Sequence, residues 1–131
     1  MFGNSLTPVL LQKALDGTWQ RQKAISENIA NHETPGYKSK NISFENLLER
    51  EMNQVHFSSE EEKDRSLRKI RDVKINVSTD FSTSERLDGN NVNLDVENIQ
   101  MAKTQIQYQY LTRCMTDFFS RLRYAISEGR K

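Results

Sequence analysis

Residues 26–38 read SENIANHETPGYK, and this stretch decides how the rest of the chain is interpreted. An apolar-patterned segment runs into it and must end before Pro35, because proline disfavours helical geometry at the preceding residue. Asn31 is the predicted left-handed closing residue of that helix. Pro35 and Gly36 suit the central pair of a type II turn, in which glycine supplies the positive φ. The stretch therefore predicts a helix stop, a tight turn and an extended exit.

Upstream of this stretch, the sequence predicts a long amphipathic helix over residues 8–31. Thr7 is its expected N-cap and Pro8 its first residue, since the missing N–H of proline has no partner there. At about 36 Å, this helix is long for a small domain. Gly17 lies inside it, either at a close approach to another element or as a tolerated weakness. Its stripe, at spacings of 3 and 4, comprises Leu11, Leu15, Thr18, Gln22, Ile25 and Ile29, widened by Leu10, Ala14 and Trp19.

A second long helix is predicted over residues 93–129, with a length of about 52 Å if unbroken. Asn93 or Asp95 caps it, Glu97 favours its positive end, and Gly129 suits its stop. Its stripe comprises Met101, Thr104, Tyr108, Leu111, Met115, Phe118, Leu122 and Ala125, broadened by Ile99, Ile106, Tyr110, Phe119 and Ile126. The first helix is too short to cover this stripe, so the surplus apolar residues are candidates for contacts between subunits.

The middle region, residues 32–92, is predicted to be polar. A short helix is expected over residues 43–54, capped by Ser43. Residues 56–72 carry five acidic and five basic side chains and are interpreted as a solvated linker, with a transient helix as the alternative.

A short strand is predicted at residues 73–77, where apolar and polar side chains alternate. Its pairing partner is expected at Arg86 and Leu87 or outside the chain, and residues 88–91 are expected to form a turn. Together the elements predict a mainly α fold in a single domain of residues 1–131. Its long helices pack as an antiparallel coiled-coil-like hairpin, with a short middle helix and an irregular or short-β central segment.

Composition excludes several classes of protein. Lys and Arg number 19 against 18 Asp and Glu, which argues against a nucleic-acid-binding module. No apolar run of about 18 residues predicts insertion into a membrane, and no basic segment precedes the apolar N-terminal residues as in a cleavable secretory signal. Hydrophobic residues make up 35% of the chain, below the ~45–50% of average domains, so neighbours are expected to complete its apolar surface.

No pattern typical of catalysis, metal binding or cofactor binding is found in the sequence. His32 and His56 lie far apart and lack a partner cysteine, and Cys114 is interpreted as a small buried apolar residue. There is no glycine-rich phosphate loop. We therefore expect a protein that is not an enzyme and binds no cofactor.

Residues 26–38 resemble the N-terminal signature of the bacterial flagellar axial proteins, which are the rod, hook and hook-associated components. Within that family the likeness is closest to the proximal rod. The chain lacks room for the extra β-domains of hook and distal-rod members, and residues 17–22 and 88–95 also match. The signature residues that carry the resemblance are Ser26, Asn28, Ile29, Ala30, Asn31, Thr34, Pro35, Gly36, Tyr37 and Lys38.

The resemblance implies a structural subunit that is exported through the flagellar type III apparatus without a cleaved signal. In the periplasm it would assemble helically into the first part of a torque-transmitting rod that carries the export channel. Implied partners are other copies of itself, FliE, FlgC-type rod proteins and the export apparatus. The residues expected to pack helices or subunits together are Leu11, Leu15, Trp19, Ile25, Ile29, Met101, Tyr108, Leu111, Met115, Phe118 and Leu122.

For the signature itself, we hypothesise that Asn28 and Asn31 bond backbone groups where the helix ends. Pro35 and Gly36 would then redirect the chain from an inner helical layer to an outer one; a plain helix stop is the simpler interpretation. Two alternative functions stay open: another rod component such as FlgC, and a soluble helical adaptor or chaperone that binds a client helix.

Overall fold

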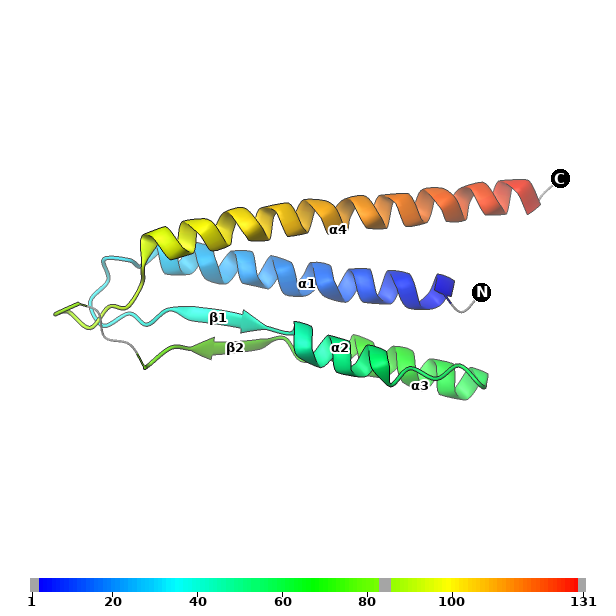
Figure 1. Cartoon of the computed structure of the whole chain (residues 1–131), viewed down its shortest axis with the longest axis horizontal. Coiled ribbons are helices and arrows are strands. Elements are labelled where there is room, and N and C mark those ends of the chain that lie inside the picture. Colours follow the sequence, from blue (N-terminus) through cyan, green and yellow to red (C-terminus); the bar gives the residue numbers. More distant parts are fainter. Residues whose placement is uncertain (1–2, 83–85, 130–131) are drawn as a thin grey trace.

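The computed structural model describes residues 3–82 and 86–129 of the chain, and two long helices dominate it (Figure 1). Helix α1 spans Gly3–Ala30 and helix α4 spans Leu94–Gly129. They lie side by side and run in opposite directions, so that the two chain ends share one end of the molecule. The predicted helical hairpin is therefore confirmed.

The start of α1 differs from the prediction. The helix begins at Gly3, and Pro8 lies inside it instead of at its first position. Thr7 is therefore not the N-cap. The helix tolerates Pro8 because only one backbone hydrogen bond is lost, near an end where several N–H groups lack helical partners anyway. The start of α4 follows the prediction, since the Asn93 side chain accepts from the backbone N–H groups of Asp95 and Val96 at 3.0 and 3.3 Å.

A two-stranded antiparallel sheet lies on the other side of α1 from α4 (Figure 1). Strand β1, Lys40–Ser43, pairs with strand β2, Asn76–Thr79, with Ile42 opposite Val77. The expected pairing with Arg86 and Leu87 is therefore wrong. Strand β2 also begins later than the alternation predicted, because Val73 is buried and follows a helix directly.

Two short helices complete the middle region. Helix α2 spans Glu45–Asn53, and its N-cap is Phe44 without a capping side-chain bond. Ser43 is thus not the cap; it is the last residue of β1.

Helix α3 spans Glu60–Arg71, where the sequence was interpreted as a solvated linker. The Ser59 side chain caps it by accepting from the Glu62 N–H at 3.2 Å. Acidic residues fill its first turn and basic residues its last, as the helix dipole favours. Leu67 and Ile70 are buried, so that this charged segment has an apolar face that holds it to the fold.

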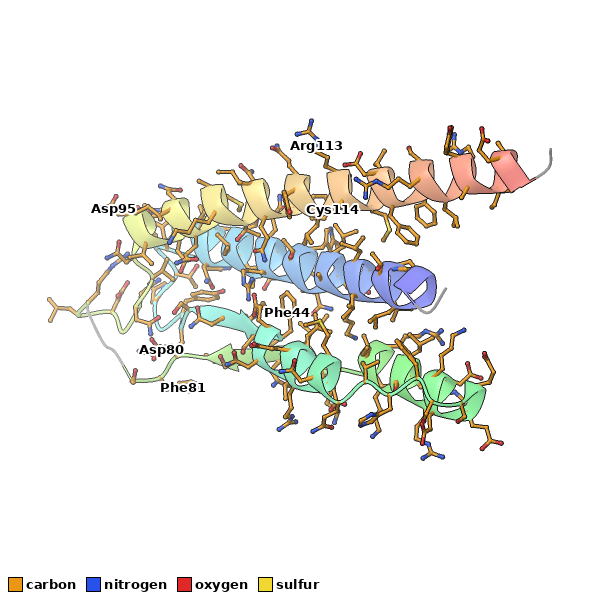
Figure 2. All side chains as sticks on the ribbon, turned by 45° about the vertical axis from the view of Figure 1, so that its right-hand side comes forward. Phe44, Asp80, Phe81, Asp95, Arg113 and Cys114 are labelled. Atoms are coloured by element: carbon orange, nitrogen blue, oxygen red, sulfur yellow. The ribbon has the colours of Figure 1, made fainter. Side chains whose placement is uncertain are left out.

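The apolar core sits under α1. Ala24, Ile42 and Phe44 form its centre, and Leu48 and Ile75 pack against them. Figure 2 shows Phe44 between α1 and the layer of β1 and α2. A Cβ atom on Gly17 would lie 2.4 Å from the ring of Phe44, so Gly17 marks a close approach and is not merely tolerated.

Candidate functional site

The signature residues meet a second loop in what we call the polar junction, residues 26–40 together with 86–97. Asn28 is its centre and is completely buried. Its amide donates to the Lys40 carbonyl at 2.9 Å, and its side-chain oxygen accepts from the Lys40 N–H at 2.9 Å and the Tyr37 hydroxyl at 3.0 Å. Asn28 thereby occupies the edge of β1 as a neighbouring strand would, and it fixes the sheet to α1.

Arg21, which lies about two helical turns before Asn28 in α1, bonds the same strand. Its guanidinium donates to the Ile42 carbonyl at 3.0 Å and pairs with the Glu45 carboxylate at 2.5 Å. Burial raises the pKa of Glu45, but hydrogen bonds from Arg21 and from backbone N–H groups outweigh it and hold that pKa below its usual value. Arg21 and Asn28 of α1 together hold β1 by hydrogen bonds along the edge of the strand that faces α1.

Helix α1 ends in the tight turn that the sequence predicts. The Tyr37 N–H donates to the Thr34 carbonyl at 3.2 Å, and Gly36 has a φ of 73°. Asn31 does not adopt the expected left-handed conformation, since no non-glycine residue in the described ranges has a positive φ. Instead its amide donates to the Glu27 carbonyl at 2.8 Å, and its side-chain oxygen accepts from the Thr34 hydroxyl at 3.0 Å. The Asn31 side chain therefore caps the C-terminal end of α1 by bonding a carbonyl of its last turn.

The second loop brings a fully buried asparagine to this helix end. The Asn90 amide donates to the carbonyls of Asn31 and Thr34, at 2.8 and 2.9 Å. Its side-chain oxygen accepts from the Val92 N–H at 2.8 Å. One side chain therefore adds a second hydrogen bond to each of two carbonyls just beyond the end of α1, which already accept from the Thr34 and Tyr37 N–H groups, and holds its own loop in shape at the same time.

The two turns touch through their glycines. The Gly36 N–H donates to the Asp88 carbonyl at 2.8 Å, and Lys38 donates to the Gly89 carbonyl at 2.6 Å. Gly89 has a φ of 82°, and a Cβ there would lie 3.6 Å from the Gly36 Cα. Both glycines are required for their backbone conformation, and a Cβ at Gly89 would make only an ordinary van der Waals contact.

Further bonds tie the second loop to both strands. The Asn91 side chain accepts from the Ser39 N–H at 2.7 Å and donates to the Asp80 carbonyl at 2.8 Å. Arg86 donates to the carbonyl of His32 and, at 2.8 Å, to that of Val92. The junction therefore joins the end of α1, the sheet and the start of α4 in one network.

Glu97 is the one acidic side chain buried in the junction, with 7% of its surface exposed. Burial raises its pKa, and a hydrogen bond from Asn28 opposes that rise. Burial likewise raises the pKa of the neighbouring Tyr37. The contact between Glu97 and Asn28 also shows which turn of α4 lies beside the end of α1.

Among residues 3–82 and 86–129, no group of three or more His, Cys, Asp or Glu side chains is placed to hold a metal ion. In the same ranges no helix is long and apolar enough to cross a membrane. Cys114 is half-buried and unpaired with any cysteine. The site is a structural junction that fixes how the helices and the sheet are joined.

Not every predicted residue is buried in the junction or in the packing between the helices. Ser26, Ala30 and Pro35 are exposed, and Ile29 is half-buried. Of the expected packing residues, only Ile25 is buried, and Trp19 and Tyr108 are exposed. The half-buried ones are Leu11, Leu15, Met101, Leu111, Met115, Phe118 and Leu122.

The sequence interpretation missed Arg86, Asn90, Asn91 and Glu97 as parts of the site. A signal was available in the run DGNNVN at residues 88–93, because short amide side chains bond nearby backbone groups readily. That run predicts a turn, but nothing in it indicates that the amides bond to a segment more than fifty residues earlier.

Comparison with known proteins identifies relatives that match most of the chain. Residues 11–38 match the family described as "Flagella basal body rod protein". The flagellar basal body rod protein FlgB of Bacillus subtilis (strain 168) is 33% identical over 120 residues, which cover 92% of each chain. FlgB of Borreliella burgdorferi is 32% identical over 113 residues, covering 80% of this chain and 84% of the relative. FlgB of Escherichia coli (strain K12) is 30% identical over 105 residues, covering 75% and 76%. The chain therefore belongs to the FlgB family of flagellar basal body rod proteins.

Proposed function

We propose that this protein is a subunit of the proximal rod, which assembles helically and forms part of a drive shaft that transmits torque and carries the export channel. Membership of the family already makes it a structural component of the basal body rod and not an enzyme. The observation that carries the finer proposal is the likeness to FlgB over nearly the full length of both chains. It favours FlgB-type over FlgC-type rod proteins and over a soluble adaptor.

Helix α4 supports self-assembly because it carries two stripes on opposite faces. One holds Thr104, which is buried on the side of α1. The other holds Ile99, Ile106 and Tyr110, each more than half exposed. Helical spacing puts Arg113 on the same stripe, and in Figure 2 this side chain points away from α1. An exposed apolar stripe of this length on a small protein is typical of an interaction surface.

The implied partners follow from the position in the rod. We infer that the subunit contacts further copies of itself, FliE on one side and FlgC-type rod proteins on the other. It would reach the periplasm through the flagellar type III export apparatus without a cleaved signal. The signature and packing residues then act in assembly, with the polar junction joining the inner helices to the outer part of the subunit.

The test is to purify basal bodies from cells that carry a tagged copy of this protein. We expect the tag in the rod, close to the membrane ring, and we expect deletion to abolish rod formation and motility. A tagged protein found only in the cytoplasm, with normal rods in the deletion strain, would support the adaptor function instead.

A further inference from the structure

Strand β2 is the outer strand of the small sheet, since β1 lies between it and α1 (Figure 1). All four of its residues are exposed. One edge of β2 pairs with β1, and the other edge faces away from the rest of the fold. The hydrogen-bond pattern of β1 decides which backbone groups lie on that outer edge.

The contact of β1 with α1 fixes the direction of the backbone groups in both strands. Lys40 uses its N–H and its carbonyl to bond the Asn28 side chain, so both groups point away from β2. In an antiparallel pair, two opposite residues point their N–H and C=O groups either both toward the other strand or both away from it. Thr79 lies opposite Lys40, so its groups point outward, and the alternation along the strand gives Val77 the same direction.

The four outward groups of Val77 and Thr79 have no hydrogen-bond partner in the described part of the chain. Residues 83–85 are too few to supply a partner at Val77, because they must also join Ser82 to Arg86, and Val77 lies five residues before Ser82. A single copy of the chain therefore leaves this edge unpaired at Val77.

The side chains of this edge do not protect it from pairing. Sheet edges are usually blunted by proline or by charged side chains, and Asn76–Thr79 contains neither. Val77 is 58% exposed, and Phe81, four residues later, is 77% exposed and lies at the outer margin of the molecule in Figure 2. The edge thus combines unpaired backbone donors and acceptors with exposed apolar side chains.

We propose that β2 binds an extended segment of a different protein along this edge, as a third strand of the sheet. An extended chain fits because its own backbone presents donors and acceptors at the spacing of those of Val77 and Thr79. The side chain that lies beside Val77 should be β-branched or aromatic, since such neighbours stabilise paired strands. The edge lies on the other side of α1 from α4, so this contact leaves α4 free for its own neighbours (Figure 1).

A second copy of this chain is a poorer occupant of the edge. Strand β1 already has β2 on one edge and the Asn28 side chain on the other, so among the described strands only the outer edge of β2 is free. Two such edges that meet form a contact between identical surfaces, which joins two copies and goes no further, whereas a helical assembly needs contacts between different surfaces. This choice of partner rests on the proposed rod function.

The first test needs no variant. Hydrogen exchange of residues 73–82 is measured by mass spectrometry for the wild-type chain, in purified basal bodies and in the isolated subunit at the same pH. The amides of Val77 and Thr79 should exchange about tenfold more slowly or less in basal bodies, because main-chain hydrogen bonds protect them there. Unchanged exchange at both amides would overturn the proposal.

Val77→Pro tests whether a paired strand causes the protection. Proline removes the outward N–H and sets a ring on that edge, while the bonds between β1 and β2 remain, because the Val77 N–H takes no part in them. Incorporation into rods should fall about tenfold, at an unchanged thermal unfolding midpoint of the purified chain. The matched control Val77→Thr keeps the N–H and the β-branch and should be incorporated normally. Normal incorporation of Val77→Pro would overturn the proposal, and if that variant unfolds, the exchange measurement decides alone.

Ser78→Cys in a Cys114→Ser background, which removes the only cysteine of the chain, tests for a second copy at the edge. Two β2 strands paired antiparallel about Ser78 would place these two residues opposite one another, within reach of a disulfide. We expect no covalent dimer in rods, and its appearance would overturn the choice of a different protein. Absence of the wild-type chain from basal bodies would contradict the rod function itself, whereas its presence there without slowed exchange would remove only the strand contact.

Discussion

The polar junction and the distal half of α4 differ in how far their side chains find contacts within the chain. In the junction, Asn28, Asn90 and Asn91 are buried, and no buried side-chain N or O atom in the described part of the chain lacks a hydrogen-bond partner. In the distal half of α4, Phe119 and Ile126 are about half exposed. The junction is complete within one chain, whereas the distal helix presents apolar surface that residues 3–82 and 86–129 leave uncovered. The fold of the subunit and its assembly therefore depend on different residues, and substitutions should separate them.

The largest effect on stability is expected from Asn28→Ala. It removes the three hydrogen bonds to Lys40 and Tyr37 and the one to Glu97, and it leaves the Lys40 N–H and carbonyl without partners, which should lower the free energy of unfolding by about 3 kcal/mol. Denaturant unfolding of the purified chain, followed by circular dichroism, measures this. Asn28→Asp should be no better, because it sets a carboxylate oxygen against the Lys40 carbonyl and beside Glu97.

The matched control for this prediction is Asn98→Ala, on an exposed position of α4. It should change stability by no more than about 0.5 kcal/mol. Equal losses at both positions would mean that the junction does not hold the fold together.

A somewhat smaller loss is expected from Gly36→Val. The φ of 73° strains a β-branched residue, at about 2 kcal/mol, although no atom lies within 4 Å of the added Cβ. We expect the redirected chain to misplace the sheet and to block rod assembly, scored by motility and by rods in purified basal bodies. Gly36→Asn should be milder, since asparagine tolerates this conformation. Normal rods with Gly36→Val would show that the turn is only a helix stop.

The sequence allowed the helices and the turn to be predicted because both depend on nearby residues. The stripes at spacings of 3 and 4 identify α1 and α4, and Pro35 and Gly36 identify the turn. At α3 the dense charges favour a linker with at most a transient helix, whereas the cap at Ser59 and the buried pair Leu67 and Ile70 stabilise a full helix in the fold.

The backbone bonds of Asn28 and Asn31 agree with the hypothesis drawn from the sequence, whereas the contacts of the second loop and the strand pairing were beyond prediction from one sequence. Asn90 bonds a carbonyl 59 residues earlier, and β1 finds its partner strand across α2 and α3. Neither pairing gives a periodic pattern in the sequence. An asparagine in an exposed turn and one in a buried network cannot be told apart from the sequence alone. The burial of Glu97 also could not be predicted, because acidic residues in the first turn of a helix are normally solvated.

Glu97→Gln should raise the stability of the folded chain near pH 7, by less than Asn28→Ala and Gly36→Val lower it. Burial raises the pKa of Glu97 in the folded chain, so the folded state binds its proton more tightly than the unfolded state. Its favourable contribution is then full below the ordinary value of 4.5 and is lost as the pH rises through the raised pKa. The variant should therefore match the wild type at low pH and unfold at a higher temperature near pH 7. The control Glu49→Gln, on an exposed position of α2, should show no such pH dependence; a gap between Glu97→Gln and wild type that narrows with rising pH would contradict the prediction.

The smallest effect on stability, and the sharpest separation of the two regions, is expected from Ile106→Ser. This side chain is more than half exposed on the outward stripe of α4, so its loss should change the unfolding free energy of the isolated chain by no more than about 0.5 kcal/mol. Incorporation into rods should nevertheless fall, because the stripe then presents a polar group to the neighbouring copy. Ile25→Ser provides the reverse case, since Ile25 is 5% exposed and its loss should destabilise the chain before any assembly. If Ile106→Ser destabilised the chain as much as Ile25→Ser, the outward stripe would belong to the fold of the subunit and not to its assembly.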